Sequence, residues 1–156
     1  MRHNRAFSLI ELVIVVVIVG IIAAIAIPRL SRGAEGAAEA ALRGDLAVMR
    51  NAIDLYVTEH VGDYPSYGSF QFQMTMFSNT TGGTAASSGG TYIYGPYLRA
   101  IPPLPWGDNR GATAIKMPPP DGLGPYGWVY DEATGHITAN VDPGEVDSSG
   151  AALINY

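Results

Sequence analysis

Hydrophobic residues form one long uninterrupted block near the start of the chain. From Leu12 to Ile27 no charged or strongly polar residue occurs. A helix of this length is roughly 24 Å long, and adding residues 7–10 brings the run close to a ~30 Å hydrocarbon core. Glu11 lies inside this longer run. A carboxylate within a membrane-length apolar segment is costly, so Glu11 indicates a functional site with a partner.

A periodic apolar stripe follows the block and predicts an amphipathic helix over residues 29–61. Its members recur at steps of three and four residues: Leu42, Leu46, Met49, Ile53 and Tyr56. Glu39 with Arg43, and Arg50 with Asp54, are spaced as i,i+4 ion pairs on the polar side of this helix. The stripe needs a sheet to cover it, and the second half of the chain must supply that sheet.

Proline and glycine mark where this helix bends and ends. Pro28 has no amide donor and crowds the carbonyl one turn before it, which predicts a kink there. Gly62 and Pro65 end the helix. We therefore divide the chain into a leader (1–6), an apolar helix (7–28), its amphipathic continuation (29–61) and a globular head (62–156).

The head contains one clear hairpin signal. Two runs rich in β-formers, 126–131 and 136–141, flank a four-residue loop that ends in Gly135. Trp128 and Tyr130 are expected on one face, meeting Ile137 and Ala139 across the pair. A third strand is expected over 113–117. The fold class is therefore α+β: a long N-terminal helix, kinked near Pro28, whose second half packs against a small antiparallel sheet.

The rest of the head is irregular. Residues 66–77 alternate aromatic and methionine side chains with polar ones, which is typical of a short strand, although a loop packed on the helix fits as well. Residues 78–91 are low in complexity and are expected to be mobile. They include Asn79-Thr80-Thr81, which matches a glycosylation triplet.

Composition narrows the functional classes. The 156-residue chain carries a formal charge of −5, and losing Arg2 and Arg5 with the leader would make it −7, from 7 basic and 14 acidic residues. Such an acidic chain is unsuited to binding nucleic acid directly. It has no cysteine. No pattern for a nucleophile and its base, a phosphate loop or a zinc site occurs, so we expect no enzymatic activity.

The stretch RAFSLIELVIVVVIVGIIAAIAIP resembles the N-terminal signature of the type IV pilin superfamily, which includes type IV pilins and the pseudopilins of type II secretion and competence systems. In that family a prepilin peptidase cleaves before a Phe and methylates its new amine, and a Glu four residues later is needed for assembly. The resemblance places cleavage between Ala6 and Phe7, methylation on Phe7, assembly on Glu11 and the kink on Pro28. Ala6 stands where the family usually has Gly.

Two simpler interpretations of the N-terminus compete with this one. The basic start, apolar core and Ala24-Ile25-Ala26 also fit a secretory signal peptide cleaved after Ala26. An uncut signal anchor fits the same composition. Both leave Glu11 unexplained, because a carboxylate weakens either segment. The mature N-terminus separates the alternatives: Phe7 for a pilin-like protein, Ile27 for a secretory signal.

Within the superfamily, the resemblance extends to the head. The segment Ile101-Pro102-Pro103-Leu104-Pro105-Trp106-Gly107 is similar to the LP-x-x-PWG segment of the major type II secretion pseudopilin, with Leu104 at a position where an Asp is expected. Together with the missing cysteines, this favours a pseudopilin over a pilus subunit used for adhesion, motility or DNA uptake. A monomeric membrane-anchored binding module is the alternative outside the superfamily.

The resemblance also implies the chain's partners and location. A subunit of this kind is inserted in the bacterial inner membrane as a single-pass protein with its head in the periplasm. It then polymerises with copies of itself and with minor pilins or pseudopilins, on an inner-membrane assembly platform. No cofactor is expected. The acidic C-terminal turn, which contains Asp142, Glu145 and Asp147, is interpreted as a solvated turn, with a calcium site as the alternative, because the calcium-loop motif of the major pseudopilins is not intact here.

Overall fold

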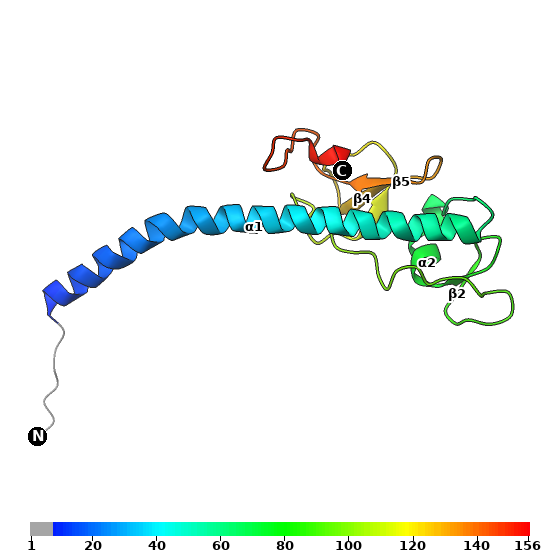
Figure 1. The fold of residues 1–156 in the computed structure, drawn as a ribbon, viewed down its shortest axis with the longest axis horizontal. Coiled ribbons are helices and arrows are strands. Elements are labelled where there is room, and N and C mark those ends of the chain that lie inside the picture. Colours follow the sequence, from blue (N-terminus) through cyan, green and yellow to red (C-terminus); the bar gives the residue numbers. More distant parts are fainter. Residues whose placement is uncertain (1–7) are drawn as a thin grey trace, which may run out of the picture. The chain divides into compact units, whose positions relative to one another are not determined.

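The computed structural model describes residues 8–156, without the side chains of residues 28, 31 and 32. One helix, α1 (Leu9–Glu59), accounts for a third of the chain. The chain divides into two units between Ala37 and Ala38, and α1 contributes to both. The α+β fold class is confirmed, with a long apolar N-terminal helix followed by small sheets (Figure 1).

The head is built on the C-terminal part of α1. The predicted stripe is confirmed, because all five of its side chains are at most 2% exposed: Leu42, Leu46, Met49, Ile53 and Tyr56. The sheet contributes Trp128, Tyr130, Ile137 and Ala139 to the same core, and the rest of the cover comes from α2, the proline-rich segment and the C-terminal turn. Burying large side chains of this kind contributes about 1.5–3 kcal/mol each, so the burial of the stripe is a large part of the head's stability.

The sheet has the strand order β3-β4-β5. Strands β4 (Tyr126–Asp131) and β5 (His136–Ala139) form the predicted antiparallel hairpin, in which Trp128 lies opposite Ala139 and Tyr130 opposite Ile137. Strand β3 (Ala114–Lys116) is the expected third strand, but it pairs with β4 in parallel. The proline-rich connection between them returns the chain to the same end of the sheet before β4 begins.

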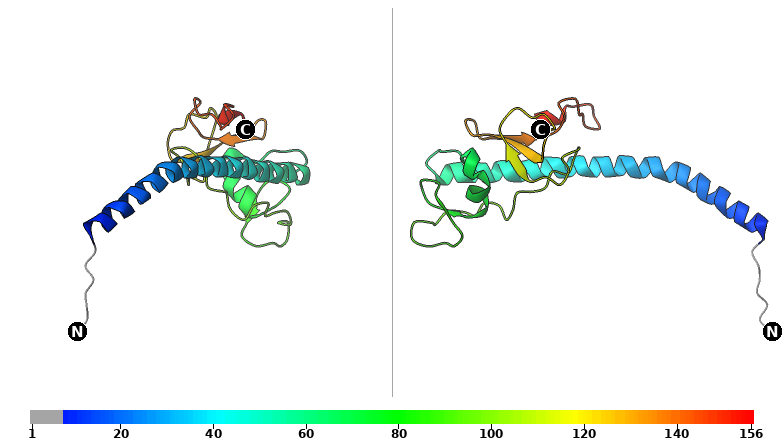
Figure 2. Two further views of the ribbon diagram at one scale, coloured as in Figure 1. Left: turned by 60° about the vertical axis from the view of Figure 1, so that its left-hand side comes forward. Right: turned by 180° about the vertical axis from the view of Figure 1, so that it is seen from behind.

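Residues 67–75 are helical, and the strand or loop expected there is wrong. The 3-10 turn η1 (Tyr67–Ser69) leads into the short helix α2 (Phe70–Thr75). Phe70, Gln73 and Met74 are buried at helical spacing, whereas Phe72 is exposed. The alternation of apolar and polar residues suggested a strand, but it does not follow burial, because the polar residue Gln73 is buried. In Figures 1 and 2, α2 and the β4–β5 hairpin lie on different sides of this part of α1.

The low-complexity segment is partly ordered. Strand β1 (Phe77–Ser78) pairs with β2 (Thr84–Ala85) in an antiparallel hairpin. Asn79 closes its loop, because the side-chain oxygen accepts hydrogen bonds from the amides of Thr81 and Gly83 at 3.1 and 2.8 Å. The chain ends in a second 3-10 turn, η2 (Leu153–Asn155), which packs on β5.

The proline-rich segment before β3 belongs to the core. Leu104, at the position where the family pattern has an Asp, is 1% exposed, and Ile101 is also buried. The indole nitrogen of Trp128 donates to the carbonyl of Pro102 at 2.8 Å, which fixes this segment against the hairpin. An apolar residue at position 104 therefore follows from its place inside the head.

Candidate functional site

The first candidate site is the apolar part of α1. Residues Leu9–Ile27 form a 19-residue span with a mean hydropathy of 3.2, and none of it is buried inside the structure. Among the described residues it is the one helix that is long and apolar enough to cross a membrane. Side chains this apolar need an apolar environment, so the span must be covered by lipid or by other helices.

Glu11 lies in the first turn of this span. Ser8 precedes the helix, and its main-chain amide donates to Oε2 of Glu11 at 3.0 Å. This is half of a capping box, in which the third helical residue reaches back to the amide of the N-cap residue. The positive end of the helix dipole also favours a carboxylate here. The Ser-x-x-Glu spacing of residues 8–11 could have revealed this contact in the sequence, but our sequence analysis missed it.

The other predicted N-terminal residues are only partly covered by the structure. Ala6 and Phe7 lie outside the described residues. Pro28 falls inside α1, which the structure describes as continuous from Leu9 to Glu59. Cleavage before Phe7, its methylation and the kink at Pro28 therefore stay predictions.

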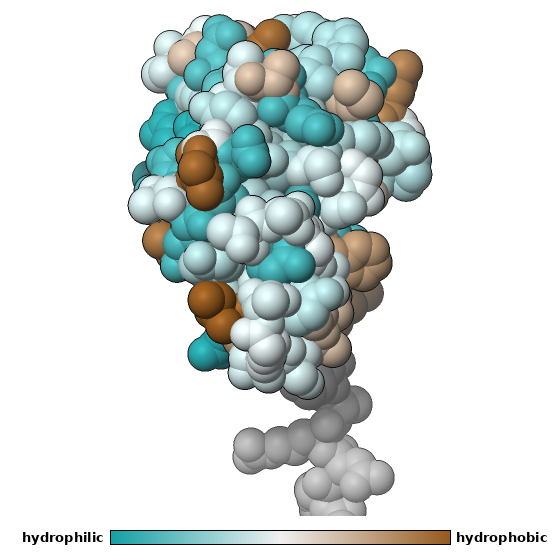
Figure 3. Space-filling model, turned by 90° about the vertical axis from the view of Figure 1, so that its right-hand side faces the viewer, coloured by the Kyte–Doolittle hydropathy of each residue, from teal (hydrophilic) through white to brown (hydrophobic). Residues whose placement is uncertain are grey.

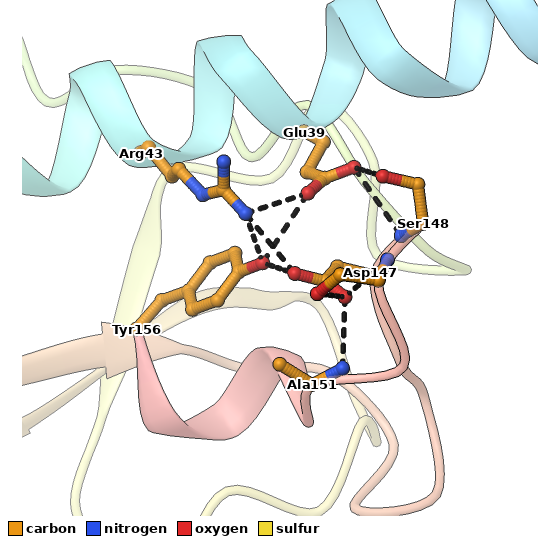
Figure 4. Close-up of polar contacts among 7 residues, drawn as sticks. Glu39, Arg43, Asp147, Ser148, Ala151 and Tyr156 are labelled. Atoms are coloured by element: carbon orange, nitrogen blue, oxygen red, sulfur yellow. Dashed lines mark hydrogen bonds and ion pairs between the residues drawn. The ribbon is translucent and has the colours of Figure 1, made fainter.

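A second group of polar residues ties the C-terminal segment to α1, and we call it the C-terminal clasp (Figure 4). It consists of Glu39, Arg43, Asp147, Ser148 and Tyr156. Arg43 donates to Glu39 at 2.7 Å and to Asp147 at 3.0 Å, and the hydroxyl of Ser148 donates to Glu39 at 2.9 Å. The hydroxyl of Tyr156 donates to Asp147 and accepts from Arg43.

The clasp changes the interpretation of the two predicted ion pairs. Glu39 and Arg43 do pair, but Glu39 is 5% exposed and faces the C-terminal loop rather than solvent. Arg50 turns to the main-chain carbonyls of Ile137 and Tyr156 instead of pairing with Asp54. Helical spacing identified these side chains as neighbours, but it could not show which of them the head would cover.

Asp147 is held as a carboxylate by the groups around it. Its Oδ1 accepts from the hydroxyl of Ser149 at 2.7 Å and from the amides of Ser149 and Ala151 at 2.8 Å. These donors and the hydroxyl of Tyr156 lower the pKa of Asp147 far below its ordinary value. These contacts favour the charged form of Asp147, which anchors the C-terminal loop.

The structure does not bring the three proposed calcium ligands together. Asp147 is turned into the clasp, while Asp142 accepts from the amide of Gly144 at 2.7 Å in a tight turn. Glu145 lies near Asp108 and Asp142. Burial and these two charges raise the pKa of Glu145. Within residues 8–156, as far as they are described, no three acidic or histidine side chains are placed to hold a metal ion. Asp147 is instead bound by Arg43 and by the main-chain amides of Ser149 and Ala151.

Comparison with known proteins identifies the N-terminal segment. Residues 1–27 match the family described as the prokaryotic N-terminal methylation motif. No curated protein and no solved structure gives a significant match to the chain. The motif is the signature of type IV pilins and pseudopilins, and it covers the segment that holds Glu11 and the apolar span.

Proposed function

We propose that this chain, a type IV pilin-like precursor processed by prepilin peptidase, is a structural subunit of a filament assembled from the inner membrane, and that the filament is a type II secretion pseudopilus. One observation carries this proposal. Within the methylation motif, a carboxylate lies at the start of a 19-residue apolar helix that the rest of the chain leaves uncovered.

The apolar helix supplies the polymerising surface. Cleavage between Ala6 and Phe7 would place a positive amine about one turn from Glu11. In a bundle of such helices, the amine of one copy can pair with Glu11 of its neighbour, which aligns the helices along their axes. Removing one partner of such a buried pair costs on the order of 3–5 kcal/mol, so a slip in register is strongly disfavoured.

The head would then lie on the outside of the filament. Contacts between unlike surfaces of identical subunits generate open helical polymers. The subunit's partners are copies of itself, minor pseudopilins, prepilin peptidase and the assembly platform. The chain would pass through the inner membrane once before it enters a periplasmic filament.

Mass spectrometry of the mature protein tests the processing. We expect an N-terminus at Phe7 that carries one methyl group. A protein that begins at Ile27 would instead be a secreted product of an ordinary signal peptide, and an intact Met1 with no filaments would favour a monomeric membrane-anchored module.

The choice of a pseudopilin over a pilus pilin is supported by the head. It has no cysteine. Its proline-rich segment resembles that of the major pseudopilin except at Leu104. Ile101 and Leu104 of this segment are buried in the core, and Trp106 packs against it. The alternative is a type IV pilus pilin. Complementation distinguishes them: in a bacterium that lacks its major pseudopilin, we expect this chain to restore protein secretion. Restoring twitching or adhesion in a pilin-deficient strain instead would favour the alternative.

A further inference from the structure

A polar cavity opens beside the C-terminal end of α1. Its volume is about 440 Å³. The lining side chains used here are those of Tyr56, His60, Asp63, Tyr64, Gln73 and Glu132. Figure 3 faces this end of the head, where the surface is mostly hydrophilic and carries only isolated apolar residues.

The walls of this cavity are fixed by internal contacts. Gln73 donates to the carbonyl of Gly82 at 2.9 Å and accepts from the amide of Ser66 at 2.8 Å. The ring of Tyr64 rests on Gly135, where an added Cβ would lie 2.2 Å from a ring carbon. The loop of the β4–β5 hairpin therefore holds Tyr64 in place, and the cavity is formed before anything enters it.

The charges that face the cavity are negative. Asp63 and Glu132 line it, and none of the described lysines and arginines does. Nδ1 of His60 lies 2.8 Å from the carbonyl oxygen of Tyr56, and its Nε2 lies 3.1 Å from the hydroxyl of Ser78. Both ring nitrogens therefore already have hydrogen-bond partners within the head. Burial and the nearby charge of Asp63 raise the pKa of Tyr56. The cavity therefore attracts a positively charged group.

The basic residues of the head differ in whether they are already paired. Arg43 binds the clasp, Arg50 binds two carbonyls, and Lys116 pairs with Asp121 at 2.5 Å. Arg99 and Arg110 are both exposed, and neither side chain has a hydrogen-bond or ion-pair partner in the described part of the chain. Arg110 follows Asp108 by two residues, whereas Arg99 has no acidic residue near it in the sequence. Arg99 is also the only charged residue between Asp63 and Asp108.

We infer that the cavity beside the C-terminal end of α1 receives the guanidinium group of Arg99 from a neighbouring copy of the chain. This inference rests on the proposed filament. From Ala38 onward the head carries 12 acidic and 5 basic residues, so neighbouring heads repel one another unless their contacts pair opposite charges. Arg99 is not part of the cavity, so the contact joins two unlike surfaces and can propagate along a filament.

The chemistry of the cavity suits a guanidinium. This group is planar, donates in a fork toward carboxylates and stacks on aromatic rings. Asp63 and Glu132 supply the carboxylates, and Tyr64, which is 41% exposed, supplies a ring. Lysine would satisfy the charge but neither the fork nor the stacking, so we expect Arg99→Lys to weaken the contact.

Cross-linking within filaments tests the contact, and the absence of native cysteine makes the labelling specific. Filaments of full-length chain carrying both Asp63→Cys and Arg99→Cys are treated with a short bis-maleimide. A linker is needed because an Arg–Asp pair separates the two Cα atoms by more than a disulfide spans. We expect a ladder of covalent oligomers. The matched control, Asp63→Cys with Arg110→Cys, moves the second cysteine to the head's other arginine that is exposed and unpaired among the described residues, and it is expected to give no ladder.

Charge reversal gives a second readout. Arg99→Glu is expected to lower filament yield about tenfold, and adding Asp63→Arg to that variant is expected to restore it, while the unfolding midpoint of each protein stays unchanged. Filaments of the Asp63/Arg99 cysteine pair that give no ladder, or a ladder equal to the Arg110 control, overturn the inference and leave the filament function intact. If the wild-type chain forms no filament, the proposed function and this inference both fall.

Discussion

Replacing Glu11 with glutamine separates the two interactions that this side chain can make. Glutamine keeps an oxygen that can accept the hydrogen bond from the amide of Ser8, but it carries no charge. Alanine removes both the charge and the acceptor. The pair of variants therefore tests whether Glu11 acts mainly as a helix cap or as the partner of a neighbouring amine.

The two roles predict different magnitudes. A cap hydrogen bond contributes about 1 kcal/mol, which is roughly a fivefold change in an equilibrium constant. Loss of one member of a buried charge pair costs about 3–5 kcal/mol, which is between two and nearly four powers of ten. If the charge pair aligns the helices, Glu11→Gln is expected to abolish filaments almost as completely as Glu11→Ala.

Membrane insertion of the monomer serves as the control. Glu11 is the third residue of the span, only about 3 Å along the axis from its start, so its carboxylate can reach the interface. We therefore expect both variants to insert and to be processed normally. Filaments are measured by shearing, pelleting and electron microscopy. A glutamine variant that assembles like wild type, beside an alanine variant reduced about fivefold, would refute the charge-pair role.

Four further changes test the head, each by thermal unfolding of the full-length chain in detergent. Asp147→Asn is expected to lower the unfolding midpoint at pH 7 and to flatten the loss of stability on acidification. The lowered pKa of Asp147 contributes stability that is present above its unfolded pKa of about 3.9 and is lost as the pH falls below it. An unchanged pH profile would contradict this. Glu145→Gln is expected to raise the unfolding midpoint at pH 7 and to leave it unchanged at low pH, because the raised pKa of Glu145 means that its ionisation opposes folding. An equal gain at both pH values would contradict this explanation. Val61→Asn is expected to stabilise by about 1 kcal/mol, because Val61 is exposed with φ of 61°, and a neutral result would show that no strain is stored there. Gly135→Ala is expected to destabilise the head, since its Cβ would overlap Tyr64, whereas Gly150→Ala, also at positive φ but with open space around it, is the control for backbone strain alone.

The parts of the fold that follow a simple period could be predicted from the sequence. The stripe from Leu42 to Tyr56 and the register of Trp128 with Ala139 depend on the 3.6- and 2-residue repeats of helix and strand, and both are as expected. Glu11 could likewise be singled out from its neighbours in the sequence, as a carboxylate within an apolar run. In each case the relevant neighbours are set by the backbone geometry of one element.

The features that depend on distant contacts could not be predicted. Asp147 was assigned to a candidate metal site because its local sequence is acidic, and nothing near it in the sequence shows that Arg43, 104 residues away, pairs with it. Gln73 likewise interrupts an apolar pattern, although its side chain is satisfied by Ser66 and Gly82. The cavity beside α1 combines residues from three separate segments, so no single stretch of sequence reveals it.

The separation of the apolar stripe on α1 from the hairpin that covers it has a consequence for biosynthesis. The last residue of the stripe, Tyr56, is made 72 residues before Trp128 (128 − 56). At a synthesis rate of about 5–20 residues per second, the stripe waits roughly 4–14 seconds for its partner. During that interval only earlier segments such as α2 can pack on the stripe, so its burial is incomplete and its side chains are free to engage other nascent chains.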